Sequence, residues 1–245
     1  MLHAADASLQ VLQEADSRYS GHVVCGLTPS VGKLMIPQYV QRFRRELPGA
    51  TLTIFPLLSV TLHQQLRASR LDFAILHEAS ASPGLDITPL CEQSLFVFGT
   101  YPLGEHADRV SIRALKNIPL VMPSEAHAVR KTVEVAAARA GVSLDIRFEV
   151  DAFDAILELV KQGVGHTIST GVATTGLSPG LALQEITTPR LRSELSLVTP
   201  LQRNLTPLQS KAAELARETF MALHEVAQKK GRGARHDGSV RPQTP

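Results

Sequence analysis

The sequence predicts an α/β protein with two lobes of similar size. Short apolar runs typical of buried strands alternate with amphipathic segments of helical spacing from residue 21 to residue 76, and the alternation returns between residues 119 and 169. Further apolar runs near 90–98 and 195–201 follow these two regions and predict that the chain crosses into the second lobe and back. We therefore expect an inserted second lobe and a ligand cleft between the lobes. The expected boundaries are residues 21–91 with 199–228 for the first lobe and residues 92–198 for the second.

The opening stretch predicts three parallel strands joined by two helices. His22–Leu27 and Thr51–Leu57 are apolar or β-branched runs, and Phe73–Leu76 closes the second strand–helix–strand unit. Apolar side chains recur at helical spacing after the first strand, and we expect this helix to start near Leu34 because Pro37 fits within a first turn. Polar turns follow the first two strands, at the positions where open parallel sheets bind ligands.

The rest of the chain adds signals for individual elements. Asp86–Leu90 and Ser94–Gly99 are predicted as two separate strands. Ser111 is expected to cap a short helical turn, and Asp151 is expected to cap the helix that follows it. Thr206 precedes a proline, which predicts the start of the last helix, and that helix should end near residue 229.

Composition argues for a globular protein away from membranes. The chain has 245 residues, of which 44% are hydrophobic, and no apolar run approaches the roughly 18 residues of a membrane helix. Acidic residues and glutamines interrupt the N-terminal segment, which therefore does not have the pattern of a signal peptide. We expect a cytoplasmic protein that makes no contact with a membrane.

The basic residues are concentrated at the C-terminus. The formal net charge is +2, but residues 229–245 carry five bases and one acid, so the remaining body is slightly acidic. Such a body has no electrostatic footprint for nucleic acid. We expect residues 229–245 to be a disordered, solvated basic tail.

Residue patterns for covalent or metal chemistry are missing from the sequence. Cys25 and Cys91 are the only cysteines, and we expect two buried, reduced thiols. The nine histidines show no metal-ligand spacing, and there is no nucleophile elbow or Cys-x-x-Cys pair. We therefore expect no cofactor, no metal site and no enzymatic activity.

Three diffuse motifs occur in a characteristic order. They are Ile36-Pro37 with Phe43 and Pro48, Leu66 with Leu71-Asp72-Phe73-Ala74, and Val160 with Gly163-Val164-Gly165. Together they resemble the effector-binding domain of LysR-type transcriptional regulators, over roughly residues 21–223. The match departs from the family at Leu57-Leu58, where an acidic residue and a glycine are common, and at Ser69-Arg70, where a glycine is usual.

The resemblance implies a two-lobed fold similar to type 2 periplasmic solute-binding proteins, with a small effector, such as a small organic acid, in the cleft. It also implies homodimers or homotetramers, and DNA binding only through a winged helix-turn-helix that this sequence does not contain. Residues 1–20 would be the remnant of the linker helix, and the plainer alternative is an N-terminal surface helix. Two rival functions remain at this point, a solute-binding protein of a transporter and an enzyme on the same fold.

Four candidate effector contacts lie in the first lobe after the first two strands, namely Thr28, Ser30, Ser59 and Thr61. Their hydroxyls and the helix N–H groups behind them could receive an anionic group. The alternative is that these hydroxyls do no more than cap their helices, and for Thr61 this is equally plausible.

The remaining candidates are mostly histidines. His77 follows the third strand and could pair with a carboxylate, or could be an ordinary histidine at a strand end. The second lobe contributes His127, near the start of a helix, and His166 and Thr170, which flank a strand. Each of these three is a plausible liner of the predicted cleft.

Overall fold

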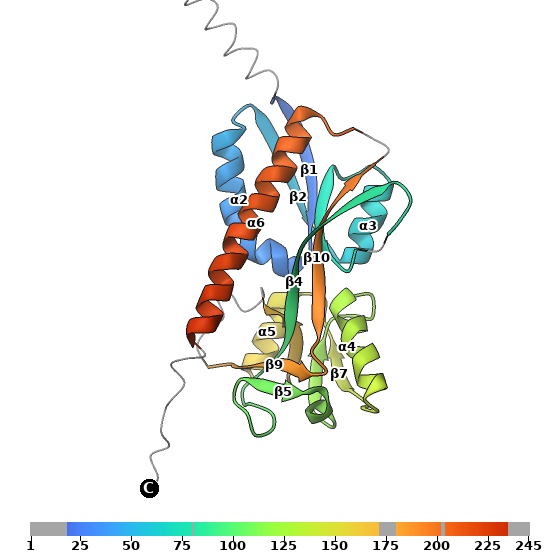
Figure 1. Ribbon diagram of the computed structural model, residues 1–245, viewed down its shortest axis with the longest axis vertical. Coiled ribbons are helices and arrows are strands. Elements are labelled where there is room, and N and C mark those ends of the chain that lie inside the picture. The colour runs from blue at the N-terminus through green and yellow to red at the C-terminus, as the bar shows by residue number, and fades with distance from the viewer. Residues whose placement is uncertain (1–18, 80, 172–179, 202–203, 235–245) are drawn as a thin grey trace, which may run out of the picture. The chain divides into compact units, whose positions relative to one another are not determined.

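A computed structural model describes the backbone of residues 19–79, 81–171, 180–201 and 204–234 (Figure 1). The chain divides into two compact units. Unit 1 comprises Met1–Cys91 and Glu194–Thr219, and unit 2 comprises Glu92–Ser193 and Phe220–Pro245. The chain therefore leaves unit 1, builds unit 2, and returns to complete unit 1.

Unit 1 is built on a sheet with strand order β2 (Ala50–Pro56), β1 (Gly21–Leu27), β3 (Phe73–His77) and β10 (Arg192–Pro200). Strand β1 pairs with β2 and β3 in parallel, as predicted, whereas β10 pairs with β3 in the antiparallel direction. Its helices are α2 (Pro29–Glu46), α3 (Ser59–Arg67) and the first part of α6 (Pro207–Ala234). Helices α2 and α6 lie on one face of this sheet and α3 lies on the other (Figure 1).

The prediction that α2 starts near Leu34 is wrong. The helix begins at Pro29, with Thr28 as the N-cap residue, and Pro37 lies inside it. A proline at the first helical position costs nothing, because that N–H has no partner within a helix. Pro37 removes one internal hydrogen bond, but the helix is held by apolar side chains on either side of it, since Met35 and Tyr39 are fully buried.

In unit 2, Leu95–Gly99 of β4 (Leu85–Gly99) pairs antiparallel with β8 (Thr167–Thr170) and β9 (Ala182–Thr188). The other elements are β5 (Arg109–Ser111), a 3-10 turn (Ile112–Leu115), β6 (Pro119–Met122), α4 (Ala128–Arg139), β7 (Asp145–Glu149) and α5 (Phe153–Lys161). Strand β4 is continuous, so the prediction of two separate strands is wrong. Glu92 and Gln93, which lie between the two predicted strands, alternate along one extended strand in which Gln93 is buried.

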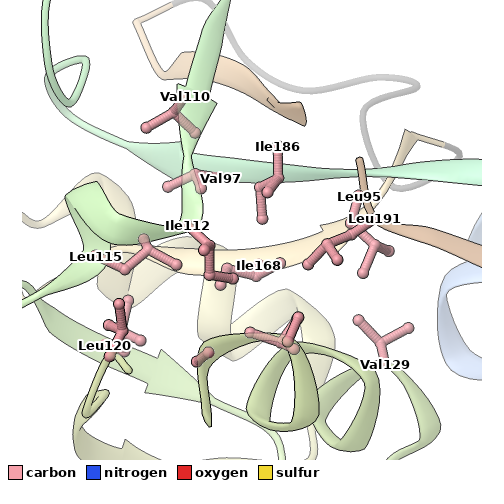
Figure 2. Close-up of a cluster of buried hydrophobic side chains, with 14 of the residues drawn as sticks. Leu95, Val97, Val110, Ile112, Leu115, Leu120, Val129, Ile168, Ile186 and Leu191 are labelled. Atoms are coloured by element: carbon pink, nitrogen blue, oxygen red, sulfur yellow. The ribbon is translucent and has the colours of Figure 1, made fainter. Parts of the chain in front are cut away.

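The core of unit 2 is a cluster of aliphatic side chains between its sheet and α4 (Figure 2). Leu95 of β4, Ile168 of β8 and Ile186 of β9 are at most 2% exposed. Leu120 of β6 and Val129 of α4 close the cluster from other elements. Strands distant in the sequence are thereby fixed against one another, and their ends are held in place.

Helix starts explain how several elements are positioned. Ser111 caps the 3-10 turn by accepting a hydrogen bond from the Arg113 N–H, as predicted. Thr206 and Gln209 form a reciprocal capping box at the start of α6. The prediction for Asp151 is wrong, because the N-cap of α5 is Ala152 and the Asp151 carboxylate accepts a hydrogen bond from the Ser124 N–H, 2.9 Å away, in the turn after β6.

The two ends of the chain are described only in part. Helix α6 continues to Ala234, six residues into the predicted basic tail. Residues 1–18 and 235–245, which include most of the predicted linker remnant, lie outside the described residues. Neither cysteine forms a disulfide, but Cys91 is partly exposed rather than buried as predicted. No helix within the described ranges is long and apolar enough to cross a membrane.

Candidate functional site

Three of the predicted contact residues of unit 1 gather at one edge of its sheet. The parallel pairing of β1 and β3 brings their carboxyl ends together, and the Thr28 N–H donates to the Ile75 carbonyl oxygen of β3 at 3.2 Å. The Ser59 hydroxyl, at the first position of α3, accepts a hydrogen bond from the His77 N–H at 3.2 Å. Thr28, Ser59 and His77 therefore belong to a single edge, which we call the unit 1 edge.

Thr28 has the most unusual environment of these residues. Its side chain is 2% exposed, and its hydroxyl oxygen is buried without a hydrogen-bond partner. Although Thr28 is the N-cap residue of α2, its side chain makes no capping hydrogen bond. The capping alternative for Thr28 is therefore wrong, and its hydroxyl is a buried polar group without a structural role, which requires another explanation.

Ser59 and His77 are also buried, at 9% and 1% exposure. Ser30 and Thr61 lie within the first turns of α2 and α3, at the second and third helical positions, and are partly exposed. Leu58, not Thr61, is the N-cap residue of α3, so the capping role considered for Thr61 is also wrong. Four of the five candidates in unit 1 thus lie at helix starts, and the fifth lies beside them on β3.

The two helix starts at the unit 1 edge favour an anion. Helices α2 and α3 both begin there, and neither has an acidic residue in its first turn. Each helix start exposes unpaired N–H groups and the positive end of the helix dipole. These features can bind a carboxylate or phosphate oxygen without any cationic side chain.

Unit 2 has a comparable edge. Strands β6 and β7 are parallel, and a bridge between Leu120 and His166 continues the parallel order to β8. Strands β6 and β7 are followed by the starts of α4 and α5. Strand β8 ends at Thr170, whose hydroxyl is buried without a partner at 1% residue exposure. His127 is the N-cap residue of α4, and its Nδ1 atom is likewise buried without a partner.

The imidazole of His127 is held in its neutral form. Burial lowers the pKa of His127, and the carboxylate of Asp151 opposes this shift. A neutral imidazole at this edge can donate or accept a hydrogen bond, but it contributes no charge. The unit 2 edge therefore offers polar, uncharged groups at His127 and Thr170.

His166 lies at the other end of β8 from Thr170. Its Nε2 atom bonds with the Tyr101 carbonyl oxygen at 3.1 Å, and its ring packs edge-on against the Tyr101 ring. Gly99 leaves the space that the imidazole fills, since a Cβ atom there would overlap the ring. The structure thus places His166 with the loop that begins at Tyr101 and not with His127 and Thr170.

Sequence reasoning missed two residues of these edges. Asp151 fixes the turn after β6 through Ser124, a contact between positions 27 residues apart that no local pattern reveals. Glu78 follows His77 at the unit 1 edge with φ 51°, a left-handed conformation that is uncommon for a residue with a side chain. No glycine or asparagine marks that position. Within the described residues, no group of three or more histidines, cysteines or acids could hold a metal ion.

Comparison with known proteins gives one consistent result. Residues 16–221 match the family described as the LysR substrate binding domain. The nitrogen assimilation regulatory protein nac of Escherichia coli (strain K12) is 25% identical over 199 residues, which cover 80% of this chain and 65% of that protein. The chain spans 62% to 65% of the length of three such curated relatives.

Solved structures agree at the level of the fold. The Synechocystis PCC6803 CcmR regulatory domain, solved in complex with 2-PG, has a TM-score of 0.73 at 17% identity and covers 83% of this chain and 97% of its own. The effector binding domain of QuiR, in complex with shikimate, has a TM-score of 0.66 at 17% identity, covering 86% and 98%. The fold is that of type 2 periplasmic-binding-protein-like regulatory domains.

Proposed function

The chain belongs to the LysR substrate-binding-domain family, and on this premise we propose that it is the effector-sensing part of a LysR-type transcriptional regulator. The curated relatives include nitrogen assimilation regulators and hydrogen peroxide-inducible gene activators, whose names describe control of genes. The effector would bind one conformation of the domain more tightly than another, and this difference in affinity would bias the regulator.

We propose the unit 1 edge as the place where an acidic group of the effector binds. The observation that carries this proposal is the Thr28 hydroxyl, which is buried and unpartnered at the start of an 18-residue helix that it does not cap. Ser59 would contribute a second hydroxyl, because its oxygen accepts from His77 while its hydrogen stays available to donate. The small molecules in the CcmR and QuiR structures support a small-molecule effector.

We propose that the unit 2 edge, taken by itself, suits an uncharged polar group of a small molecule. The Thr170 hydroxyl and the His127 Nδ1 atom are both buried without partners, and the neutral imidazole suits a hydroxyl or carbonyl group. Ser30, Thr61 and His77 are proposed as further contacts near the acidic group. His166 is the weakest of the proposed contacts, because its imidazole already bonds with Tyr101.

The partners and location follow from the proposed role. We propose that the domain forms homodimers or homotetramers and reaches DNA through a helix-turn-helix domain outside this sequence. A regulator must meet the chromosome, so we propose a cytoplasmic location. Sequencing the reading frame upstream of Met1 tests this, because a signal peptide there in place of a helix-turn-helix of roughly 60 residues would contradict the regulator.

A thermal-shift screen with small organic acids tests the effector site. We expect one or more acids to raise the melting temperature of the wild type and of Thr51→Val, a matched control at the exposed, opposite end of β2. Thr28→Val should melt close to the wild type, because it removes a hydroxyl without a partner, yet should lose most of the ligand-induced shift.

Three outcomes would contradict the proposal in different ways. If the acids stabilise Thr28→Val as much as the wild type, Thr28 is not a contact residue. If Ser59→Ala also responds like the wild type, the acidic group binds elsewhere. If no acid shifts any of these proteins, the proposal of an acidic effector falls.

A further inference from the structure

The carboxylate of Glu78 is fixed at the unit 1 edge by its pairing with β10. The Glu78 N–H donates to the Glu194 carbonyl oxygen at 2.9 Å, and the Glu78 carboxylate accepts from the Glu194 N–H at 3.1 Å. This pairing holds Glu78 at φ 51°. A residue with a side chain persists in such a conformation only where its surroundings impose it, and such residues cluster at functional sites.

Glu78 is next in the chain to a residue that contacts the proposed site. His77, immediately before it, donates its N–H to the Ser59 hydroxyl. The antiparallel register pairs His77 with Leu195, which places Glu194 opposite Glu78. The Glu194 carboxylate accepts a hydrogen bond from the Ser196 hydroxyl at 3.1 Å. The strand pairing thus brings two acidic residues to this edge. Both are exposed, so they act on an incoming ligand by their charge.

The unit 1 edge has little positive charge to offset these two acids. Residues 27–31, 57–61 and 75–79 form its three turns and contain no lysine or arginine. The next cation along α2 is Lys33, which is exposed and one turn into the helix. Two helix starts contribute roughly half a positive charge each, or about one in total. One carboxylate can accept hydrogen bonds from these N–H groups, which offsets its repulsion by Glu78 and Glu194. A second negative charge finds no lysine or arginine in these turns and is repelled by both acids.

We propose that the unit 1 edge selects a singly charged carboxylate group and that Glu78 is the specificity-determining residue that rejects dianions. The inference rests on the proposed effector site and concerns the charge of the ligand group that binds there. Phosphate monoesters and dicarboxylates carry about two charges near neutral pH and would be disfavoured. A neutral remainder of the ligand is unaffected by this selection.

Lactate and malonate provide matched probes, since both have three carbons and they differ by one negative charge. Dissociation constants are measured from melting-temperature titrations of the full chain at constant ionic strength and about pH 8, where imidazoles are ordinarily neutral. We expect the wild type to bind lactate about tenfold more tightly than malonate, and raising the salt concentration should shrink this ratio.

Glu78→Gln should reduce the preference for lactate about threefold or more by tightening malonate, with little change for lactate. The glutamine oxygen can still accept from the Glu194 N–H, so the backbone pairing is kept. If Glu78→Gln lowers the melting temperature of the protein, Glu194→Gln serves as the second variant. It removes the neighbouring charge and should likewise reduce the preference for lactate. Glu105→Gln, which changes an exposed acid in unit 2, is the matched control and should behave like the wild type.

The outcomes separate this inference from the proposed function. If both probes bind through Thr28 but malonate binds as tightly as lactate, or if neither glutamine variant changes the ratio, the charge selection is wrong while the site stands. If neither probe shifts the wild type, or if Thr28→Val binds lactate normally, the site itself is contradicted and the inference falls with it.

Discussion

Asp72 is the residue that ties the discontinuous parts of unit 1 together. One oxygen of its carboxylate accepts from the Val24 N–H at 2.8 Å, and the other accepts from the Gln209 side-chain amide at 2.6 Å. Gln209 also completes the capping box with Thr206 at the start of α6. The carboxylate is 8% exposed, so both of its partners would be left in a poorly hydrated place if it were changed.

Replacing Asp72 with asparagine should therefore destabilise the protein. The amide can offer an acceptor to only one of two donors, and its NH2 group then faces the other donor. We expect the free energy of unfolding to fall by about 1–3 kcal/mol in urea denaturation. Asp86→Asn, an exposed position on β4, is the control and should stay within about 0.5 kcal/mol of the wild type. Equal stability of the two variants would remove Asp72 from this linking role.

The environment of Cys25 follows from the same contact region. Burial raises the pKa of the Cys25 thiol to about 12, and the nearby charge of Asp72 adds to the shift. The thiol is therefore protonated at neutral pH and behaves as a small apolar side chain. Burial also raises the pKa of Tyr39, whose hydroxyl donates to the Ala212 carbonyl oxygen at 3.0 Å and joins α2 to α6.

At the scale of elements, the loop that begins at Tyr101 is held by β8 and β9. His166, just before β8, donates its Nε2–H to the Tyr101 carbonyl oxygen, and the amide of Gln184 on β9 bonds with both backbone groups of Leu103. Gly99 permits this arrangement, because any side chain there would overlap the His166 ring. The loop is therefore fixed by two strands that follow it by many residues.

A double-mutant cycle tests this arrangement. Gly99→Ala should lower the free energy of unfolding by about 1–3 kcal/mol, because the imidazole must move from its buried position. In a His166→Ala background the same substitution should cost markedly less, giving a coupling of at least about 0.5 kcal/mol. Chemical denaturation of the four proteins measures the cycle, and additive costs would show that the two residues do not share this space.

Much of the element pattern could be predicted from sequence because it is local. Period-two and helical periodicities placed β1, β3, β6 and the apolar face of α2, and the Thr206-Pro207 pair marked the start of α6. The start of α2 could not be placed, because a proline inside a helix is tolerated only where tertiary packing compensates for the lost hydrogen bond. The continuity of β4 also depends on partner strands far along the chain.

The candidate site could likewise be predicted from the sequence only in part. That Thr28 and Ser59 lie near each other follows from the rule for carboxyl ends of parallel strands. That the Thr28 hydroxyl lacks a partner depends on three-dimensional packing, and the left-handed conformation of Glu78 depends on β10, which is more than 100 residues away in the chain. Neither property has a local sequence signal.

At the scale of the whole molecule, three histidines make stability depend on pH. Burial lowers the pKa of His63, His127 and His224, aided at His63 by Arg67 and opposed at His127 and His224 by neighbouring carboxylates. The unfolded chain therefore binds more protons than the folded chain in the window that extends downward from about pH 6.5. Stability is fully present above that window and is lost as the pH falls through the lowered pKa values.

We expect the free energy of unfolding, measured in urea, to decrease between about pH 7 and pH 5. His127→Gln should flatten this profile, because one of the three groups no longer takes up a proton on unfolding. His106→Gln, which changes an exposed histidine, should leave the slope as it is in the wild type. Parallel profiles for His127→Gln and the wild type would contradict the assignment of a buried, neutral imidazole.

The return of the chain to unit 1 determines when unit 1 can be completed during synthesis. Strand β3 pairs with β10, and Asp72 bonds with Gln209 across 137 positions, so unit 1 stays unfinished until the whole of Glu92–Ser193 has been made. At ribosomal rates this delay is on the order of ten seconds, during which the edge of β3 has no partner. Long-range closure of this kind folds slowly. The nascent chain is thus most exposed to aggregation and to chaperones in that interval. A chain that ends before residue 194 would keep the edge of β3 unpaired permanently.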